Sequence, residues 1–352
     1  MPKSGNFIRI FALAALTALL AVAAAGTAGA SPARQAGTTI SGAGSTFVSP
    51  LVTTWIPAVS QQLGYELQYS AIGSSGGINA ITGRTVDFGA SDAPLSPDQF
   101  TACNGCVQIP WALAATSVMY NLPGVKNLLH MDGPTLAKIF MGQISVWNDP
   151  AIQKLNKGVN LPSTKIVIAH RSDGSGTTYN FTDYLANVSP AWKSQIGTGT
   201  SVSWPVGVGG KGSAGVSALV AQTPGAIGYA DVAFALKNHF SYFAMKNRSG
   251  KFATPGARGI LAAASSDQTP DKTTNALSIV NPPKKYPLAY PISTYTYVIV
   301  PTKSSKAADL RKFLFWAVTH GQEGKYTAPL RFVPIPKKVL VVAEKAITQI
   351  KS

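Results

Sequence analysis

Three short clusters of Gly, Ser and Thr, each placed between a strand-like run and a helix-like run, constrain the fold of this chain most. They are residues 41–47 (SGAGSTF), 73–77 (GSSGG) and 173–178 (DGSGTT). A strand, a glycine-rich turn and a helix in this order are typical of α/β architecture. Such a turn directs backbone N–H groups and hydroxyls to the positive end of a helix, which suits a tetrahedral oxyanion. One such cluster is also ordinary helix capping, but three clusters, one of them close behind Arg171, indicate an anion site.

The same alternation continues along the chain from Thr39. Apolar and β-branched runs predict strands, whereas apolar residues at a helical spacing, with capping signals beside them, predict helices. The predicted strands are residues 66–72, 86–90, 116–120, 166–170 and 294–300, and helices are predicted after residues 74, 96 and 177 and at 134–141, 307–318 and 338–350. Residues 245–285 are polar and rich in Gly, Ser, Thr and Asn, which predicts an irregular surface segment.

The composition is that of a globular protein with a basic surface. The 352 residues are 45% hydrophobic and 12% charged, which gives enough length and apolar content for two domains. With 30 Lys and Arg against 14 Asp and Glu, the formal net charge is +16, which favours an anionic partner. The basic residues are scattered singly and form no basic arm, so nucleic acid is not expected as a partner.

The first thirty residues have the order of a secretory signal peptide. Lys3 and Arg9 precede an apolar run over residues 10–25, and residues 28–30 (AGA) offer a cleavage site. An uncleaved membrane anchor is the alternative, but a run of about 16 residues is short for a span. No Cys follows the run, which excludes a lipid-anchored N-terminus. We therefore expect cleavage near Ala30 and an exported, periplasmic protein.

Cys103 and Cys106 are the only cysteines, and they form a C-x-x-C pair. Such a pair can be redox-active, can supply half of a zinc site or can form a small structural disulfide. No second pair is present and the four histidines are far apart in the sequence. In an exported chain this favours a disulfide between Cys103 and Cys106 and predicts no metal site.

Several longer motifs give the chain a specific resemblance. Residues 41–47, 72–77 (IGSSGG) and 86–95 (VDFGASDAPL) are similar to the opening motifs of the phosphate-binding proteins of bacterial phosphate ABC transporters. Residues 171–177 (RSDGSGT) resemble the phosphate loop in the second domain of that family. Two further stretches match it as well, namely residues 204–212 (WPVGVGGKG) and 224–229 (PGAIGY). The resemblance extends over nearly all of the chain that follows the signal peptide.

The fold that this resemblance implies is that of a type II periplasmic binding protein, in which crossing strands join two α/β lobes and the ligand lies in the cleft. The first lobe would comprise residues 37–115 and 293–352, and the second lobe residues 116–292. The crossings would lie near residues 115–120 and 292–296. Closure on the ligand would be a rigid motion of the lobes about these crossings.

The resemblance also implies a set of phosphate ligands. The first lobe would contribute Thr46, Phe47 through its backbone N–H, Ser74 and Asp92, and the second lobe Arg171, Ser175, Gly176 through its backbone N–H, and Thr177. Hydroxyls, amides and the Arg171 fork donate to the phosphate oxygens. Asp92 would accept a hydrogen bond from the proton that phosphate still carries near neutral pH. Structural roles stay open, with Arg171 in a surface ion pair and Asp92 as a turn residue, and Asp173 is expected to order its loop.

The implied function is that of an exported, monomeric receptor that captures inorganic phosphate, uses no cofactor, and delivers it to the permease and ATPase subunits of an ABC transporter. A receptor for sulfate or another oxyanion is an alternative. An exported phosphatase is a second alternative. It needs either clustered His, Asp and Glu or a base beside Ser175, and the four His and three Glu of this chain show no such spacing. An added role in adhesion or signalling leaves no motif and stays open.

Overall fold

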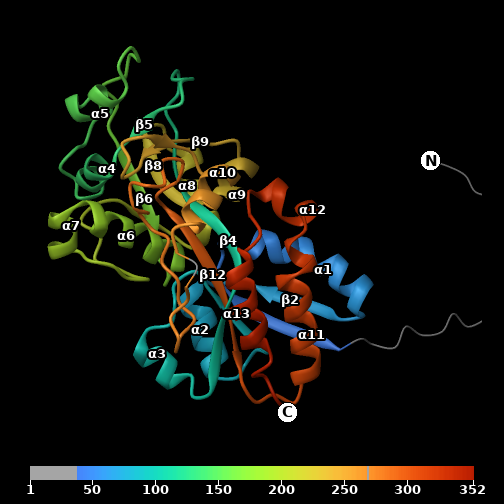
Figure 1. The fold of residues 1–352 in the computed structure, drawn as a ribbon. Coiled ribbons are helices and arrows are strands. Elements are labelled where there is room, and N and C mark those ends of the chain that lie inside the picture. The colour runs from blue at the N-terminus through green and yellow to red at the C-terminus, as the bar shows by residue number, and fades with distance from the viewer. Residues whose placement is uncertain (1–37, 268) are drawn as a thin grey trace, which may run out of the picture. The chain divides into compact units, whose positions relative to one another are not determined.

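The computed structural model describes residues 38–267 and 269–352, so the predicted signal peptide lies outside the described residues. One mixed sheet organises this part of the chain, in the strand order β2-β1-β3-β12-β4-β8-β6-β7, with β9 beside β4. Figure 1 shows β4 and β12 side by side through the middle of the fold, with α11 and α13 lying beside them. Among the described residues, no helix combines the length and the apolar character that a membrane span requires.

The first half of the sheet consists of three parallel strands, the antiparallel strand β12 and the first part of β4. Strands β1, β2 and β3 pair in parallel, and β12 pairs antiparallel with both β3 and β4. The helices α1, α2, α3, α11, α12 and α13 belong to this half. The elements are β1 (Thr39–Gly44), α1 (Ser49–Leu63), β2 (Glu66–Ser70), α2 (Ser74–Thr82), β3 (Phe88–Ser91), α3 (Pro97–Ala102), β12 (Ser293–Pro301), α11 (Ala307–Val318), η1 (His320–Gln322), α12 (Gly324–Thr327), η2 (Ala328–Leu330) and α13 (Lys337–Ile347).

The second half of the sheet holds β8, β6 and β7, with a small separate sheet of β11, β10 and β5. Strands β6, β7 and β8 are parallel to one another, and β8 is antiparallel to β4. The elements are β5 (His130–Met131), α4 (Gly133–Phe140), α5 (Pro150–Leu155), β6 (Val167–Arg171), α6 (Gly176–Val188), α7 (Pro190–Gln195), β7 (Val208–Gly210), α8 (Gly212–Gln222), β8 (Ala226–Asp231), α9 (Val232–Lys237), β9 (Ser241–Tyr242), β10 (Ala244–Lys246), β11 (Phe252–Ala253) and α10 (Ala257–Ala264).

Strand β4 (Cys106–Tyr120) joins the two halves. All fifteen of its residues are buried, and its partner changes from β12 to β8 between Ala115 and Thr116. At that point the Thr116 N–H donates to the carbonyl of Ile292, which directly precedes β12. The sequence predicted only residues 116–120 of this strand. The prediction missed residues 106–115 because this part of the strand is buried on both faces and lacks the alternation that marks a half-exposed strand.

A local irregularity in β4 has a simple cause. The register with β12 shifts between Thr296 and Tyr297, which pair with Ala112 and Pro110, so that the ladder skips Trp111 directly after Pro110. Proline has no N–H to give to a ladder, so it is accommodated where the pairing is interrupted. The neighbouring Trp111 is fully buried and packs edge-on against Trp55 and Phe88. The interruption therefore coincides with the aromatic centre of the first lobe.

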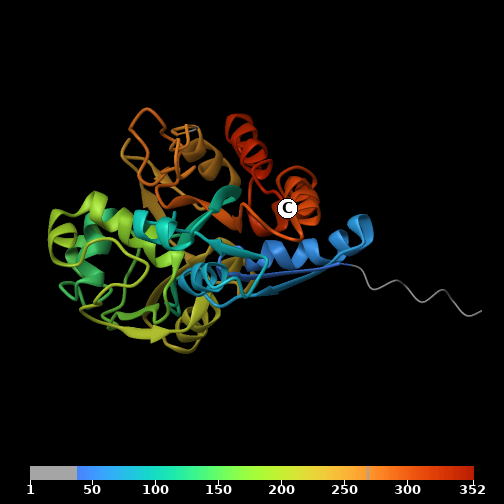
Figure 2. The ribbon, with the colours of Figure 1, turned by 90° about the horizontal axis from the view of Figure 1, so that it is seen from below.

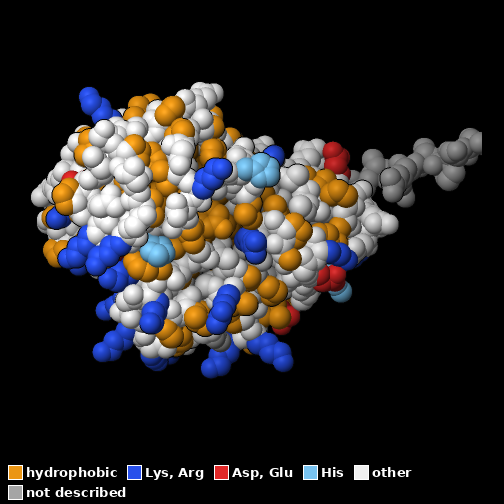
Figure 3. All heavy atoms as spheres, turned by 90° about the horizontal axis from the view of Figure 1, so that it is seen from above, with side chains coloured by type: hydrophobic (Ala, Val, Ile, Leu, Met, Phe, Trp, Pro, Cys, Tyr) orange, Lys and Arg blue, Asp and Glu red, His pale blue; other side chains and the backbone are white. Residues whose placement is uncertain are grey.

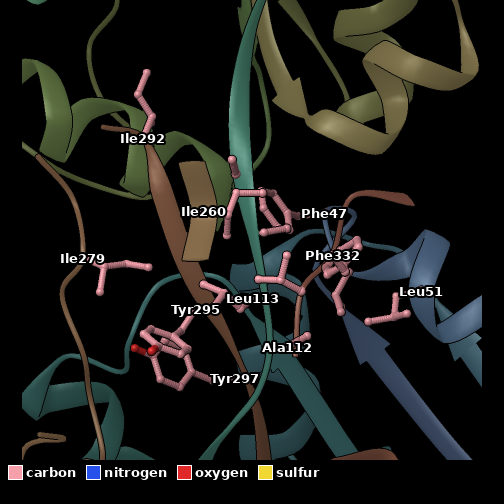
Figure 4. Close-up of a cluster of buried hydrophobic side chains, with 14 of the residues drawn as sticks. Phe47, Leu51, Ala112, Leu113, Ile260, Ile279, Ile292, Tyr295, Tyr297 and Phe332 are labelled. Carbon is pink, nitrogen blue, oxygen red and sulfur yellow. The ribbon is translucent and has the colours of Figure 1, made fainter. Parts of the chain in front are cut away.

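The hydrophobic core lies on both sides of the two central strands. Figure 4 draws buried side chains around β4 and β12, among them Phe47, Leu113, Tyr295 and Phe332. The Phe47 and Phe332 rings meet edge to face with their centroids 6.0 Å apart. Phe47, which is fully buried, thus anchors the turn after β1 in the core.

Helix boundaries follow the capping signals. Ser96 and Gln99 form a capping box at α3, as the Ser-Pro start predicted, and Asp132 caps α4. The predicted helices at 134–141, 307–318 and 338–350 are confirmed as α4, α11 and α13 within a few residues. In α11, four buried residues recur at a helical spacing: Leu310, Phe313, Leu314 and Ala317.

The prediction of an irregular segment at residues 245–285 is wrong in part. This range contains most of β10, all of β11 and the helix α10. Ile260, Ala263 and Ala264 of α10 are buried at a helical spacing, and alanine is the strongest helix former. The polar residues that surround this short helix masked its signal. The rest of the range, from 265 to 285, forms no helix or strand where it is described.

The predicted disulfide between Cys103 and Cys106 is present, with the two Cα atoms 5.6 Å apart. Arg84 holds the loop from outside, because its guanidinium donates to the carbonyls of Cys103 and Asn104 at 2.7 and 2.9 Å. The bridge therefore fastens the loop between α3 and β4.

Candidate anion-binding cleft

The cleft begins at the turn after β1, where a serine links three parts of the first lobe. Ser45 is fully buried, and its hydroxyl donates to Asp92 Oδ1 at 2.5 Å. Ser45 Oγ in turn accepts from the Phe47 N–H at 3.0 Å, and the Ser45 carbonyl accepts from the Tyr69 hydroxyl at 2.8 Å. The turn is thereby held against the end of β3. Sequence reasoning chose Thr46 and Phe47 in this cluster and missed Ser45.

Asp92 is a carboxylate enclosed by hydroxyls. It is 2% exposed, and its backbone N–H donates to Ser74 Oγ at 3.3 Å. Burial raises the pKa of Asp92 to about 6, while the Ser45 hydrogen bond, the Arg171 charge and the Thr296 and Ser74 hydroxyls oppose the rise. The group is therefore ionised at neutral pH and protonated in mild acid, which lets it accept a hydrogen bond in one range and donate one in the other.

The second lobe contributes a fixed arginine at the end of β6. The Arg171 side chain is 1% exposed and forms a fork on Asp173, with Nε to Oδ1 at 2.7 Å and Nη2 to Oδ2 at 2.5 Å. Burial would raise the pKa of Asp173, but the Arg171 hydrogen bonds and charge and the Gly212 N–H outweigh it and hold that pKa below its usual value. The second hydrogen-bonding edge of Arg171 is directed to Thr177 Oγ1, at 3.5 Å. Asp173 thus orders the loop and orients Arg171, as expected.

Helix α6 begins within the cleft. Ser175 is its N-cap and accepts from the Thr178 N–H at 3.1 Å, so its own hydroxyl proton remains to be donated. Ser175 and Thr177 are fully buried and Gly176 is the first residue of the helix. The positive end of the helix dipole therefore faces the same region as Arg171.

The two lobes touch at this point because glycines allow a close approach. A Cβ on Gly176 would lie 2.6 Å from both the Asp92 nitrogen and Ser74 Oγ. A Cβ on Gly73, which has a φ of 89°, would lie 2.4 Å from Asp173 Oδ2. The Ser75 N–H also donates to the Gly174 carbonyl at 3.1 Å. The described cleft is therefore closed, with the first and third Gly/Ser clusters joined through the second.

A second interlobe contact involves a residue that sequence reasoning missed. Thr46 Oγ1 lies 2.9 Å from Ser213 Oγ and accepts from the Ser213 N–H at 3.2 Å. Ser213 is fully buried in the first turn of α8, directly after the GKG sequence at 210–212. That Gly-Lys-Gly-Ser run before a helix was the signal that could have pointed to it.

All eight residues predicted from the sequence lie in this one region. Ser74, Asp92 and Gly176 are in contact, Phe47 is joined to Asp92 through Ser45, and Arg171 reaches Thr177. The hydrogen bond between Thr46 and Ser213 closes the edge of the cleft. Figure 2 shows the green segment that contains α6 on the left and the blue N-terminal elements to the right of it. Among the described residues, no group of three or more His, Cys, Asp or Glu could hold a metal.

One further side chain ties the cleft to the strand crossing. Asn180 lies one turn after Gly176 on α6 and is 1% exposed. Its Nδ2 donates to Thr116 Oγ1 at 2.8 Å and to the Ile292 carbonyl at 3.4 Å. It therefore contacts both chain segments at the point where β4 changes its partner.

Comparison with known proteins identifies the family. A model described as the PBP superfamily domain matches residues 28–320. The phosphate-binding protein PstS of Xylella fastidiosa (strain Temecula1) is 42% identical over 305 residues, which cover 86% of this chain and 82% of that protein. PstS of Pasteurella multocida is 37% identical over 308 residues, covering 86% and 88%. A solved periplasmic phosphate-binding protein named PfluDING, with phosphate bound, superposes with a TM-score of 0.71 at 20% identity and coverages of 88% and 93%. The chain belongs to the PBP superfamily and, within it, to the PstS phosphate-binding proteins.

Proposed function

We propose that this protein captures inorganic phosphate between its two lobes and delivers it to a phosphate ABC transporter. The observation that carries the proposal is the pairing of a buried carboxylate with a fixed arginine in one closed, hydroxyl-lined cleft. Asp92 supplies an acceptor, whereas Arg171 and the start of α6 supply donors and positive charge. A ligand that fits both must be an anion that still carries a proton, which describes hydrogen phosphate. The PstS relatives are named for the same ligand.

Each proposed site residue has a defined part in phosphate binding. The backbone N–H groups of Phe47 and Gly176 and the hydroxyls of Thr46, Ser74, Ser175 and Thr177 donate to phosphate oxygens. The Phe47 N–H donates to Ser45 Oγ and Thr46 Oγ1 lies 2.9 Å from Ser213 Oγ, so phosphate binding would exchange these hydrogen bonds for bonds to phosphate. Arg171 donates from the edge that Asp173 leaves free.

The lobe boundaries follow the change of partner along β4. We place residues 37–115 and 293–352 in the first lobe and residues 116–292 in the second. The supporting observation is that β4 pairs with β12 up to Ala115 and with β8 from Thr116. Opening would then pivot at Thr116 and Ile292, which are joined by a backbone hydrogen bond.

Export completes the proposal, since the signal-like residues 1–30 and the disulfide fit a protein that acts outside the cytoplasm. We propose no catalysis. Ser175 serves as a helix cap, and the nearest histidine in sequence, His170, stacks on Trp204 and directs Nδ1 at the Arg171 carbonyl, 3.0 Å away. A nucleophile would need a base in that place.

Calorimetric titration of the mature chain with phosphate tests the proposal. We expect saturable binding of one phosphate per chain, and no release of product when the chain is incubated with a chromogenic phosphate ester. The absence of binding heat would contradict the capture function. Turnover of the ester that Ser175→Ala abolishes would support the phosphatase alternative instead.

A further inference from the structure

An apolar groove runs along the closed edge of the cleft. Two adjoining hollows of about 480 and 300 Å³ share Ser49 and Phe234 as lining residues, so they form one continuous groove. We call it the interlobe groove. Both lobes line it, with Ser49, Ile72 and Leu330 from the first lobe and Lys211, Phe234 and Lys237 from the second.

The groove depends on the contact between the lobes. Its first wall consists of α1, the turn after β2 and η2, and its second wall consists of α9 and the start of α8. The Thr46–Ser213 hydrogen bond lies at the base, where the walls meet. A rotation that opened the cleft would separate the walls, so the groove has this form only in the closed protein.

The chemistry of the groove is apolar in the middle and basic at the edges. Ile72 is 46% exposed, and the lining surface is mostly apolar. Lys211 and Lys237 are exposed beside it, whereas its one carboxylate, Asp173, is neutralised by Arg171. Figure 3 shows one face of the molecule, on which apolar side chains lie among Lys and Arg and acidic side chains are few. A complementary partner therefore combines an apolar side chain with carboxylates.

We propose that the interlobe groove is the docking site for an acidic, apolar-tipped protein segment of the transporter's membrane subunit. Because both lobes form the groove, the segment binds the closed, loaded chain and not the open one. Without Lys3 and Arg9 of the signal peptide, the mature chain has 28 Lys and Arg against 14 Asp and Glu, and this basic excess steers it to such a partner. This proposal rests on the proposed delivery function and assigns the surface that performs it.

Two matched charge reversals test the assignment. Lys237 and Lys345 are both exposed lysines in the last turn of a helix, α9 and α13 respectively, so that reversal disturbs the helix dipole equally. Only Lys237 lines the groove. The measurement is phosphate-dependent stimulation of ATP hydrolysis by the organism's own transporter in vesicles of zwitterionic lipid, as a function of the concentration of the full mature chain.

We expect Lys237→Glu to raise the concentration for half-maximal stimulation about tenfold or more, and Lys345→Glu to change it less than about twofold. Leu330→Ser, which removes apolar surface without changing charge, should act in the same direction as Lys237→Glu. Phosphate affinity, measured by calorimetry without the transporter, should be that of the wild type in all three variants, because none of these side chains contacts the anion site.

Equal effects of Lys237→Glu and Lys345→Glu would overturn the proposal, since they would show a response to net charge alone. Binding of the wild type to anionic vesicles without transporter, lost in Lys237→Glu, would overturn it in favour of a lipid surface. A wild type that binds no phosphate would contradict the proposed function itself. A wild type that binds phosphate and stimulates the transporter, with stimulation unchanged in Lys237→Glu and Leu330→Ser, would contradict only the groove.

Discussion

The two sides of the cleft present opposite chemistry to the phosphate that we propose they bind. The first lobe presents hydroxyls around a buried carboxylate, Asp92, whose pKa burial raises to about 6. The second lobe presents an arginine, Arg171, and the positive end of α6. In the proposed site this difference separates two tasks, because the second lobe would attract any small oxyanion whereas the first lobe would accept only one that can donate a proton. Attraction and discrimination can then be altered independently.

The largest effect is expected from the discriminating side. Asp92→Asn should improve sulfate binding by about 100-fold or more and change phosphate binding less, since an amide can donate to an oxygen that the carboxylate repels. The measurement is competition calorimetry with both anions on both proteins. If the ratio of the two affinities were unchanged in the variant, Asp92 would have no part in discrimination.

The discriminating side should also respond to pH. Its raised pKa means that the folded chain retains the Asp92 proton below about pH 6, so the stability from this group is present in acid and is lost as the pH rises through 6. A protonated Asp92 can donate to sulfate. Sulfate affinity should therefore rise by up to about 100-fold between pH 8 and pH 5 in the wild type, and by much less in Asp92→Asn. Parallel pH dependence in the two proteins would assign the titration to another group.

The attracting side should show a smaller and less selective effect. Arg171→Ala should weaken phosphate binding by at least about 2 kcal/mol, or roughly 30-fold, because it removes a charge-assisted fork and leaves Asp173 without its partner. The affinity for sulfate should fall by a similar factor. Melting temperatures measured alongside provide the control: lost stability with unchanged affinity would make Arg171 a structural residue.

The smallest effect is expected where the two sides are joined. Asn180→Ala removes the hydrogen bonds from α6 to Thr116 and Ile292. It should weaken phosphate affinity by about three- to tenfold, mainly through faster release of phosphate. Asn187 on the same helix bonds only within α6, to Asp183, and Asn187→Ala is the matched control. Stopped-flow release rates distinguish the two. Equal rates in both variants would mean that Asn180 does not couple the helix to the crossing.

The sequence predicts what depends on local chemistry. The Gly/Ser/Thr clusters mark the turns after β1, β2 and β6, because glycine and hydroxyl residues are required wherever a strand turns sharply into a helix. The C-x-x-C spacing likewise predicts the disulfide, since both cysteines lie in one short loop. The resemblance of the motifs supplies the order of the lobes. These features need few residues and little tertiary context.

What the sequence misses depends on contacts between distant segments. Ser45 has no signal of its own in the sequence, and the Gly-Lys-Gly run before Ser213 marks a helix start but not its partner, so both roles arise only when Asp92 and Thr46 are brought to these serines. Helix α10 is too short for its spacing to stand out in a polar segment. The interlobe groove has no local signal at all, since its walls come from segments that are far apart along the chain.

The ratio of phosphate to sulfate affinity in the wild type tests the central claim most directly. Sulfate matches hydrogen phosphate in shape and charge but carries no proton at neutral pH, so it would place an oxygen against the ionised Asp92 carboxylate. A site built for one hydroxyl rejects the analogue that lacks it by roughly 10⁴ or more. Competition calorimetry at pH 8 should therefore show phosphate bound at least about 10⁴-fold more tightly. Equal binding of the two anions would contradict the assignment of this cleft to phosphate.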